Sequence, residues 1–154
     1  MNAEIYIIRE PMFSEEEVEK KVASIASILK YTDFNVLYRT IVAESKENLE
    51  SAFSETVSGA DYIDLIIVIG GLYNSTNCLI KSFFSDKGIS LQWNKLSNCA
   101  SFLYTQAADI PGVYLRYLDR DVILLPYLSK DIEKIVKEYV VPFLINKNRG
   151  VKNV

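Results

Sequence analysis

One segment constrains the fold of this chain more than any other: the run Asp64-Leu-Ile-Ile-Val-Ile69, which is followed directly by Gly70 and Gly71. Successive side chains of a strand point to opposite faces of its sheet, so an unbroken apolar run is buried on both faces. Strands of this kind occur in parallel sheets that helices cover on each side. The run therefore predicts the central strand of an α/β domain.

The segments before this strand alternate between strand and helix patterns. Residues 4–9 and 34–42 are predicted to be strands, and each precedes a predicted helix. The first helix begins with Ser14-Glu15-Glu16-Glu17, which has the spacing of a capping box. Its core positions recur at helical spacing: Val18, Val22, Ile25 and Leu29. The second helix, which Ser45 would cap and Gly59 would end, has four apolar positions: Leu49, Ala52, Phe53 and Val57.

The second half of the chain ends in strands and a long helix. Residues 78–84 predict a short helix that stops near Gly88. Residues 100–104, 113–118 and 121–125 predict strands, the last two joined tightly through Asp119-Arg120. A final helix from about Ser129 has a broad core face, and Pro142 is expected to bend or loosen its end. That face comprises Ile132, Ile135, Val136, Tyr139, Val140, Phe143 and Leu144.

This element order predicts a three-layer α/β/α single domain with a mostly parallel, partly mixed sheet. We expect the domain to span residues 1–146. Residues 147–154, with Lys147, Arg149 and Lys152, would form a basic tail that is solvated and frayed.

Composition excludes several classes of function. The net charge is −3 and the basic residues are scattered, which is atypical of nucleic-acid-binding proteins. The apolar runs are too short to cross a membrane and the first residues lack a signal-peptide pattern, so we expect a cytoplasmic protein. The chain has no histidine, which excludes Ser-His-Asp and Cys-His nucleophile systems. Its two cysteines, Cys78 and Cys99, are expected to be buried and unreactive.

The diglycine itself leaves two interpretations open. Ligands of α/β sheets collect at the carboxyl ends of the strands, where glycines let them approach the backbone closely. Ser75, Thr76 and Asn77 follow and could cap the next helix or bind a ligand. A tight turn without a ligand explains the pair equally well. The segment is neither a dinucleotide fingerprint nor a phosphate-binding P-loop, because the spacings of both motifs are absent.

Four segments in the right order resemble one known family. These are Asp64-Leu-Ile-Ile-Val-Ile-Gly-Gly-Leu72, Ala108-Asp-Ile-Pro-Gly-Val-Tyr114, Val122-Ile-Leu-Leu-Pro126, and Asp131-Ile132 with the helix behind it. Together they are similar to the molybdenum cofactor biosynthesis (MoaB/Mog-like, molybdopterin-binding) domain. The resemblance is strongest to the version at the N-terminus of CinA-like competence/damage-inducible proteins.

The resemblance implies a three-layer fold, assembly into dimers or trimers, and a pterin or nucleotide ligand that some members process with Mg²⁺. It implies these ligand-binding positions: Gly70, Gly71, Leu72, Tyr73, Ser75, Asn77, Pro111, Gly112 and Pro126. No other cofactor or metal ligand set is expected.

The chain departs from the family pattern at the polar positions of that site. Tyr73 and Tyr127 stand where the family has glycine, and Asn77 and Cys78 stand where it has aspartate. The lost carboxylates are the groups expected to hold Mg²⁺. Arg9 could meet a phosphate, although a pair with Glu10 or another carboxylate is favoured.

Three functions stay open. The favoured one is a non-catalytic domain that binds a pterin- or nucleotide-type ligand at the diglycine, or binds nothing. The second is an active Mg²⁺-dependent enzyme that uses Asp109 and Asp131. The third is an oligomerising interaction module, for which the many aromatic residues would furnish an interface.

Overall fold

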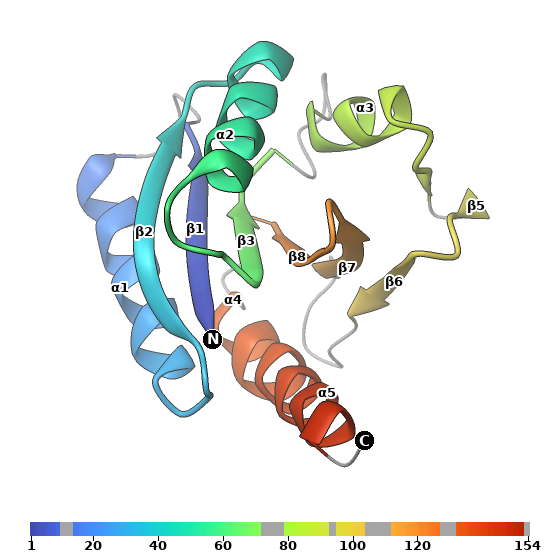
Figure 1. Ribbon diagram of the computed structural model, residues 1–154. Helices are drawn as coiled ribbons and strands as arrows, with labels where there is room; N and C mark the ends of the chain where they lie inside the picture. The colour runs from blue at the N-terminus through green and yellow to red at the C-terminus, as the bar shows by residue number, and fades with distance from the viewer. Residues whose placement is uncertain (10–13, 72–78, 93–94, 104–111, 127–131, 153–154) are drawn as a thin grey trace.

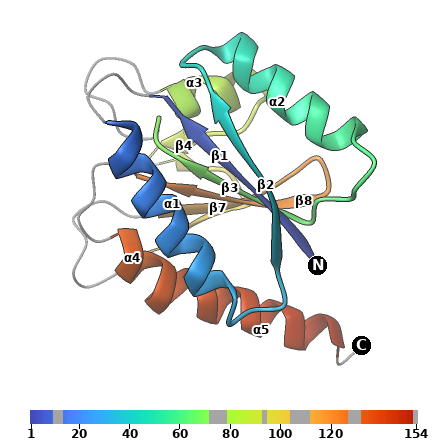
Figure 2. The ribbon, with the colours of Figure 1, turned by 90° about the vertical axis from the view of Figure 1, so that its left-hand side faces the viewer.

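The computed structural model describes residues 1–9, 14–71, 79–92, 95–103, 112–126 and 132–152, with the side chains of 139 and 147–152 excepted. It has three layers, as the sequence predicts, with helices on both faces of a mixed sheet (Figures 1 and 2). The sheet order is β2-β1-β3-β8-β7-β6. Its strands are β1 (Asn2–Ile8), β2 (Asn35–Val42), β3 (Leu65–Ile69), β6 (Ala100–Leu103), β7 (Gly112–Tyr117) and β8 (Arg120–Leu125).

The four strands β2, β1, β3 and β8 run parallel, while β7 is antiparallel to both β8 and β6. All five residues of β3 are buried, which confirms the prediction of a central strand covered on both faces. Two short strands that the sequence did not reveal, β4 (Leu91–Gln92) and β5 (Lys95–Leu96), form a separate antiparallel pair. Strands of two residues carry too little periodicity to be recognised.

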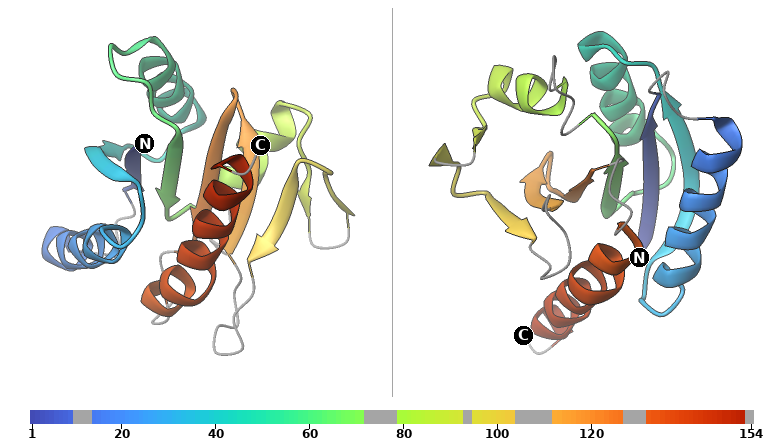
Figure 3. Two further views of the ribbon diagram at one scale, coloured as in Figure 1. Left: turned by 60° about the horizontal axis from the view of Figure 1, so that its bottom comes forward. Right: turned by 180° about the vertical axis from the view of Figure 1, so that it is seen from behind.

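Two apolar clusters fill the spaces between the layers. One packs α1 (Glu15–Leu29) and the C-terminal helical run against one face of the sheet. The other packs α2 (Lys46–Ser58) and α3 (Leu79–Asp86) against the opposite face. Figure 3 shows the same division from two further sides. In the part of the chain that the structure describes, no helix is long and apolar enough to span a bilayer.

The helix ends follow the predicted local signals. Ser14 accepts a hydrogen bond from the Glu17 amide, and Ser45 accepts one from Asn48. Gly88 ends α3 at a positive φ of 79°, and its amide donates to Ser85 while the next amide donates to Phe84. This pair of bonds is the Schellman arrangement, in which glycine tolerates the left-handed conformation.

Three expectations about local structure are wrong. Val57 is 43% exposed, and Thr56 takes its place on the buried face of α2 because its position continues the spacing of Leu49, Ala52 and Phe53. The hairpin turn lies at Leu118-Asp119 rather than Asp119-Arg120, since those two residues have positive φ angles of 53° and 59°. Such a turn matches the right-handed twist of the flanking strands. Cys99 is exposed rather than buried.

The C-terminal helix also differs from expectation. It consists of α4 (Ile132–Ile135), a π-helical turn η1 (Val136–Val140) and α5 (Val141–Lys152). The wide turn precedes Pro142, which has no amide hydrogen to donate and whose ring clashes with a regular preceding turn. The loosening therefore lies before Pro142, and the helix does not end there. Its backbone continues to Lys152, into the segment expected to be a tail; Ser129 lies outside the described residues.

Candidate functional site

The carboxyl ends of β1 and β3 meet at the point where the chain reverses its direction across the sheet. From β1 the chain crosses to β2 on one side, and from β2 it returns past β1 to β3 on the other side. The connections after β1 and β3 therefore lead away from each other and leave a crevice between them. Ile8 and Ile69 end these two strands, so the diglycine stands at this switch point.

Both glycines adopt the left-handed backbone conformation. Gly70 has a φ of 96° and Gly71 a φ of 71°, values that residues with a Cβ rarely adopt. The Gly70 amide donates to the Leu125 carbonyl at 3.0 Å, and the Gly71 carbonyl accepts from the Ile80 amide at 3.1 Å. The turn therefore ties β3 to the end of β8 and to the start of α3.

Gly71 is also required for packing. A Cβ at this position would lie 3.2 Å from Cγ1 of Ile80 and 3.5 Å from two carbons of Ile8. The first distance is tighter than ordinary van der Waals contact, and both partners belong to the buried core. These contacts support the interpretation of the diglycine as a tight turn. They do not conflict with a ligand on the outer side of that turn.

Electrostatics distinguish the helix that begins nearest the diglycine from the others at this edge. A helix N-terminus carries a partial positive charge that favours anions. The first turn of α1 contains Glu15, Glu16 and Glu17, and that of α2 contains Glu47, so both already carry negative charge. The described helix α3 has no acidic residue in its first turn. Of these three helices, α3 is therefore the one whose described first turn carries no negative side chain.

Arg9 follows β1 at the same edge. Its guanidinium lies 3.7 Å from the Glu15 carboxylate, and the two side chains are 70% and 89% exposed. The favoured expectation of a carboxylate partner is confirmed. Exposed pairs of this kind contribute at most about 1 kcal/mol, so the guanidinium can exchange its partner for a ligand at little cost.

Two further predicted positions adjoin the diglycine from the β8 side. Gly112 begins β7, and a Cβ there would lie 3.2 Å from both the Leu124 carbonyl oxygen and a Leu125 methyl carbon. Pro126 follows β8 and is buried. The structure thus brings Gly70, Gly112 and Pro126 together at the end of β8, with Gly112 and Pro126 packed into the domain.

The remaining predicted positions fall outside the described residues: Leu72, Tyr73, Ser75, Asn77, Pro111, Cys78, Asp109, Asp131 and Tyr127. Among the described residues, no group of three or more acidic or cysteine side chains is arranged to hold a metal ion. The described part of this edge therefore does not fit a Mg²⁺ site made of carboxylates.

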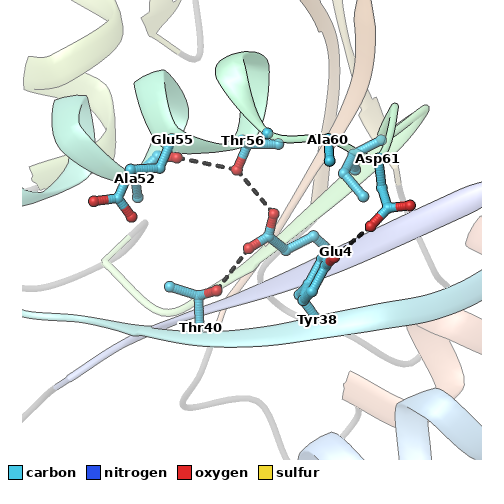
Figure 4. A pocket seen from close by; sticks show the side chains of 10 residues that line it. Glu4, Tyr38, Thr40, Ala52, Glu55, Thr56, Ala60 and Asp61 are labelled. Carbon is cyan, nitrogen blue, oxygen red and sulfur yellow. Dashed lines mark hydrogen bonds between the residues drawn. The ribbon is translucent and has the colours of Figure 1, made fainter.

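A second concave feature, which the sequence analysis did not find, lies between β2 and α2. It is a pocket of about 190 Å³, with Glu4 at its base (Figure 4). Glu4 is only 7% exposed, and its carboxylate accepts hydrogen bonds from the Thr40 and Thr56 hydroxyls at 2.6 and 2.8 Å. The sequence does contain one sign of this pocket, because Glu4 interrupts an apolar strand and shares a strand face with Tyr6.

Two tyrosines adjoin this pocket. The Tyr6 hydroxyl contacts Thr56 and the Ala52 carbonyl, and burial raises the Tyr6 pKa well above its ordinary value. The Tyr38 hydroxyl donates to Asp61 at the rim, and this hydrogen bond raises the Tyr38 pKa. Both hydroxyls are thereby kept as neutral donors.

Comparison with known proteins gives the fold. No family model matches the chain. A putative competence-damage inducible protein of Clostridium tetani is 22% identical over an alignment of 175 residues, which covers 98% of this chain and 43% of that protein. The chain thus spans less than half of that relative.

Several solved structures resemble this chain over most of its length. CinA of Thermoplasma acidophilum, a protein of unknown function, superposes with a TM-score of 0.69 at 17% identity, over 89% of this chain and 94% of that one. A molybdenum cofactor biosynthesis protein B superposes with a TM-score of 0.68 at 16% identity, over 99% and 96%. The tungsten cofactor synthesizing protein MoaB of Pyrococcus furiosus gives 0.60 at 15% identity, over 94% and 95%. The resemblance to MoaB-like and CinA-like proteins is thereby confirmed at the level of the fold.

Proposed function

We propose that this chain is a divergent, non-catalytic domain of the MoaB/CinA type, and that it binds a pterin- or nucleotide-type ligand at the switch point beside Gly70 and Gly71. The observation that carries the proposal is the position of the diglycine. Two consecutive positive φ angles follow the central strand where the crevice of an open α/β sheet lies. A ligand on the outer side of this turn would face the backbone of Gly70 and Gly71.

The charges at this edge support a ligand with an anionic group. The start of α3 lacks acidic side chains, and Arg9 stands at the end of the neighbouring strand with only a weak, exposed ion pair. A phosphate or pyrophosphate placed between them would face a helix N-terminus and a guanidinium. The replacement of the family aspartates by Asn77 and Cys78 supports binding without Mg²⁺-dependent turnover.

The test is thermal unfolding in the presence of ATP, ADP-ribose, nicotinamide nucleotides and molybdopterin, each with and without Mg²⁺. A ligand at 100 times its Kd raises the unfolding free energy by about 2.7 kcal/mol. Binding without turnover is expected. Turnover that requires Mg²⁺ would instead establish the enzyme alternative, and the absence of any shift with these ligands would refute the ligand-binding proposal.

Arg9 offers a specific variant for this test. Arg9→Ala removes the guanidinium at the switch point and is expected to weaken binding of phosphate-containing ligands severalfold. Lys20→Ala is the matched control, because Lys20 is equally exposed and forms a comparable pair with Glu16 on α1. Equal effects of the two substitutions would mean that ligand binding depends on the overall charge of the protein and not on the position of Arg9.

The interaction-module alternative rests on a different observation. The outer edge strand β2 exposes Leu37, Tyr38 and Ile41 by 42%, 47% and 64%. An edge strand with exposed apolar side chains is a surface on which a second copy of the chain can pair. We infer self-association through β2 as a second function, which is compatible with ligand binding at the diglycine. We also propose that the protein is cytoplasmic.

A further inference from the structure

The pocket between β2 and α2 has no role in the ligand binding proposed at the diglycine, and it shares Tyr38 with the proposed self-association surface. It lies near the amino ends of the strands, since Gly59, Ala60, Asp61 and Ile63 on the segment entering β3 form part of its wall. The diglycine lies beyond the opposite end of the same strand. A ligand here would occupy a separate site.

The base of this pocket is the buried carboxylate of Glu4, which is not part of a close ion pair. Glu4 is 93% removed from solvent, and the ion pairs that the described residues form do not include it. A carboxylate has about four acceptor positions, and the two threonine hydroxyls supply two protons. Burial of a charge is costly unless a partner compensates it. Glu4 thus retains acceptor positions beyond those that the two threonine hydroxyls fill, and it lines the pocket.

The walls add further acceptors. Glu55 and Asp61 line the pocket beside Glu4, and the described lining contains no lysine or arginine. The ring of Tyr38 forms another part of the lining, and aromatic faces attract cations. Figure 4 shows the Glu4 carboxylate between Thr40 and Thr56, with Asp61 against Tyr38 at one side. The pocket therefore selects for positive charge and for hydrogen-bond donors.

The arrangement disfavours a bare metal ion as the occupant. The described acidic side chains do not converge as a metal-ligating group of three or more. The volume of about 190 Å³ is large for a single ion and suits a short organic chain.

We propose that this pocket binds a small organic cation, an alkylammonium or guanidinium group, whose N–H donors contact the buried Glu4 carboxylate. The two groups share this chemistry, and the test separates them. This pocket would bind a polyamine-like or arginine-like group whether or not a ligand is bound at the diglycine.

The experiment is titration calorimetry of the intact chain with butylammonium and with butylguanidinium, whose only charged groups are an ammonium and a guanidinium respectively. Butan-1-ol and butyrate serve as neutral and anionic probes of similar length. We expect saturable binding of one or both cations and no binding of the other two probes. Absence of saturable cation binding, or equal binding of butan-1-ol, would overturn the proposal.

Three variants assign the binding to this pocket. Glu4→Gln keeps the shape of the side chain and removes its charge, and it is expected to weaken cation binding at least tenfold. Asp61→Asn, at an exposed rim position, is expected to weaken it severalfold and provides the test if Glu4→Gln does not fold. Glu133→Gln is the matched control, because Glu133 is an exposed carboxylate on α4. Loss of affinity in Glu133→Gln equal to that in the pocket variants would refute the assignment.

Discussion

Substitution of Gly71 by alanine tests whether the diglycine is held by packing as well as by backbone conformation. The left-handed conformation costs an L-residue about 1–2 kcal/mol. The new Cβ would also lie 3.2 Å from Ile80 and 3.5 Å from Ile8, both of which are buried and unable to move far. Overpacking of this kind costs about 1–3 kcal/mol. We therefore expect Gly71→Ala to lower the unfolding free energy by about 2–5 kcal/mol.

Gly88 provides a matched control within the same chain. It also has a positive φ, 79°, but among the described atoms nothing lies within 4 Å of the position its Cβ would take. Gly88→Ala thus incurs the conformational cost alone, about 1–2 kcal/mol. The difference between the two variants isolates the packing contribution at Gly71.

The assay is urea unfolding with linear extrapolation, followed by circular dichroism and by fluorescence. Asparagine variants refine it, because asparagine tolerates the left-handed region better than alanine does. Gly88→Asn should then recover part of the loss, whereas Gly71→Asn should not. If Gly71→Ala costs no more than Gly88→Ala, the close approach of Ile80 and Ile8 does not constrain this turn and the packing argument is wrong.

Three further outcomes follow from the structure. Replacement of Leu118-Asp119 by Asn-Gly should stabilise the β7–β8 hairpin by about 0.5–1 kcal/mol in the same assay, because both residues have positive φ and this pair prefers such a turn. Burial raises the Tyr6 pKa above 10.0, so the folded state keeps a proton that the unfolded state loses as the pH rises above about 10. Stability should then fall, and Tyr6→Phe should reduce the slope of that fall by up to about 1.4 kcal/mol per pH unit. The variant should keep a residual slope from Tyr38, Tyr114 and Tyr117, whose pKa values are also raised. Ile41→Lys should reduce self-association in sedimentation without loss of folding, because Ile41 is exposed on the β2 edge; unchanged sedimentation of a self-associating protein would exclude this edge.

Periodicity made most of the fold predictable. A strand that is apolar on both faces has few possible environments, and the run at 65–69 indeed lies at the centre of the sheet. The same holds for α1, in which Val22, Ile25 and Leu29 are buried as their spacing predicts. Capping residues fixed helix starts, because a Ser hydroxyl satisfies an amide within its own turn. These are local or one-dimensional signals, and they need no knowledge of the partner elements.

The predictions from sequence failed where the local structure depends on contacts with a second helix or strand. Thr56, a polar residue, is buried on α2 because its hydroxyl contacts Tyr6 and Glu4 on β1, which is distant in the sequence. The turn at Leu118-Asp119 contains no glycine, so its residues gave no sign of positive φ. The π-helical turn before Pro142 depends on whether the helix is held on both sides of the proline by core contacts at Val136, Val140 and Leu144.

The two candidate sites illustrate the same difference. The diglycine was found from the sequence because glycine after a central strand is a local feature, and its position at the switch point follows from the order of the strands. The pocket at Glu4 requires side chains from β1, β2, α2 and the segment before β3 to meet, which no single stretch of sequence reveals. Its one local trace is a carboxylate within an apolar strand. Because the Thr40 and Thr56 hydroxyls already donate to this carboxylate, titration of the Glu4→Gln variant with an organic cation tests whether its remaining acceptor positions bind a cation as well.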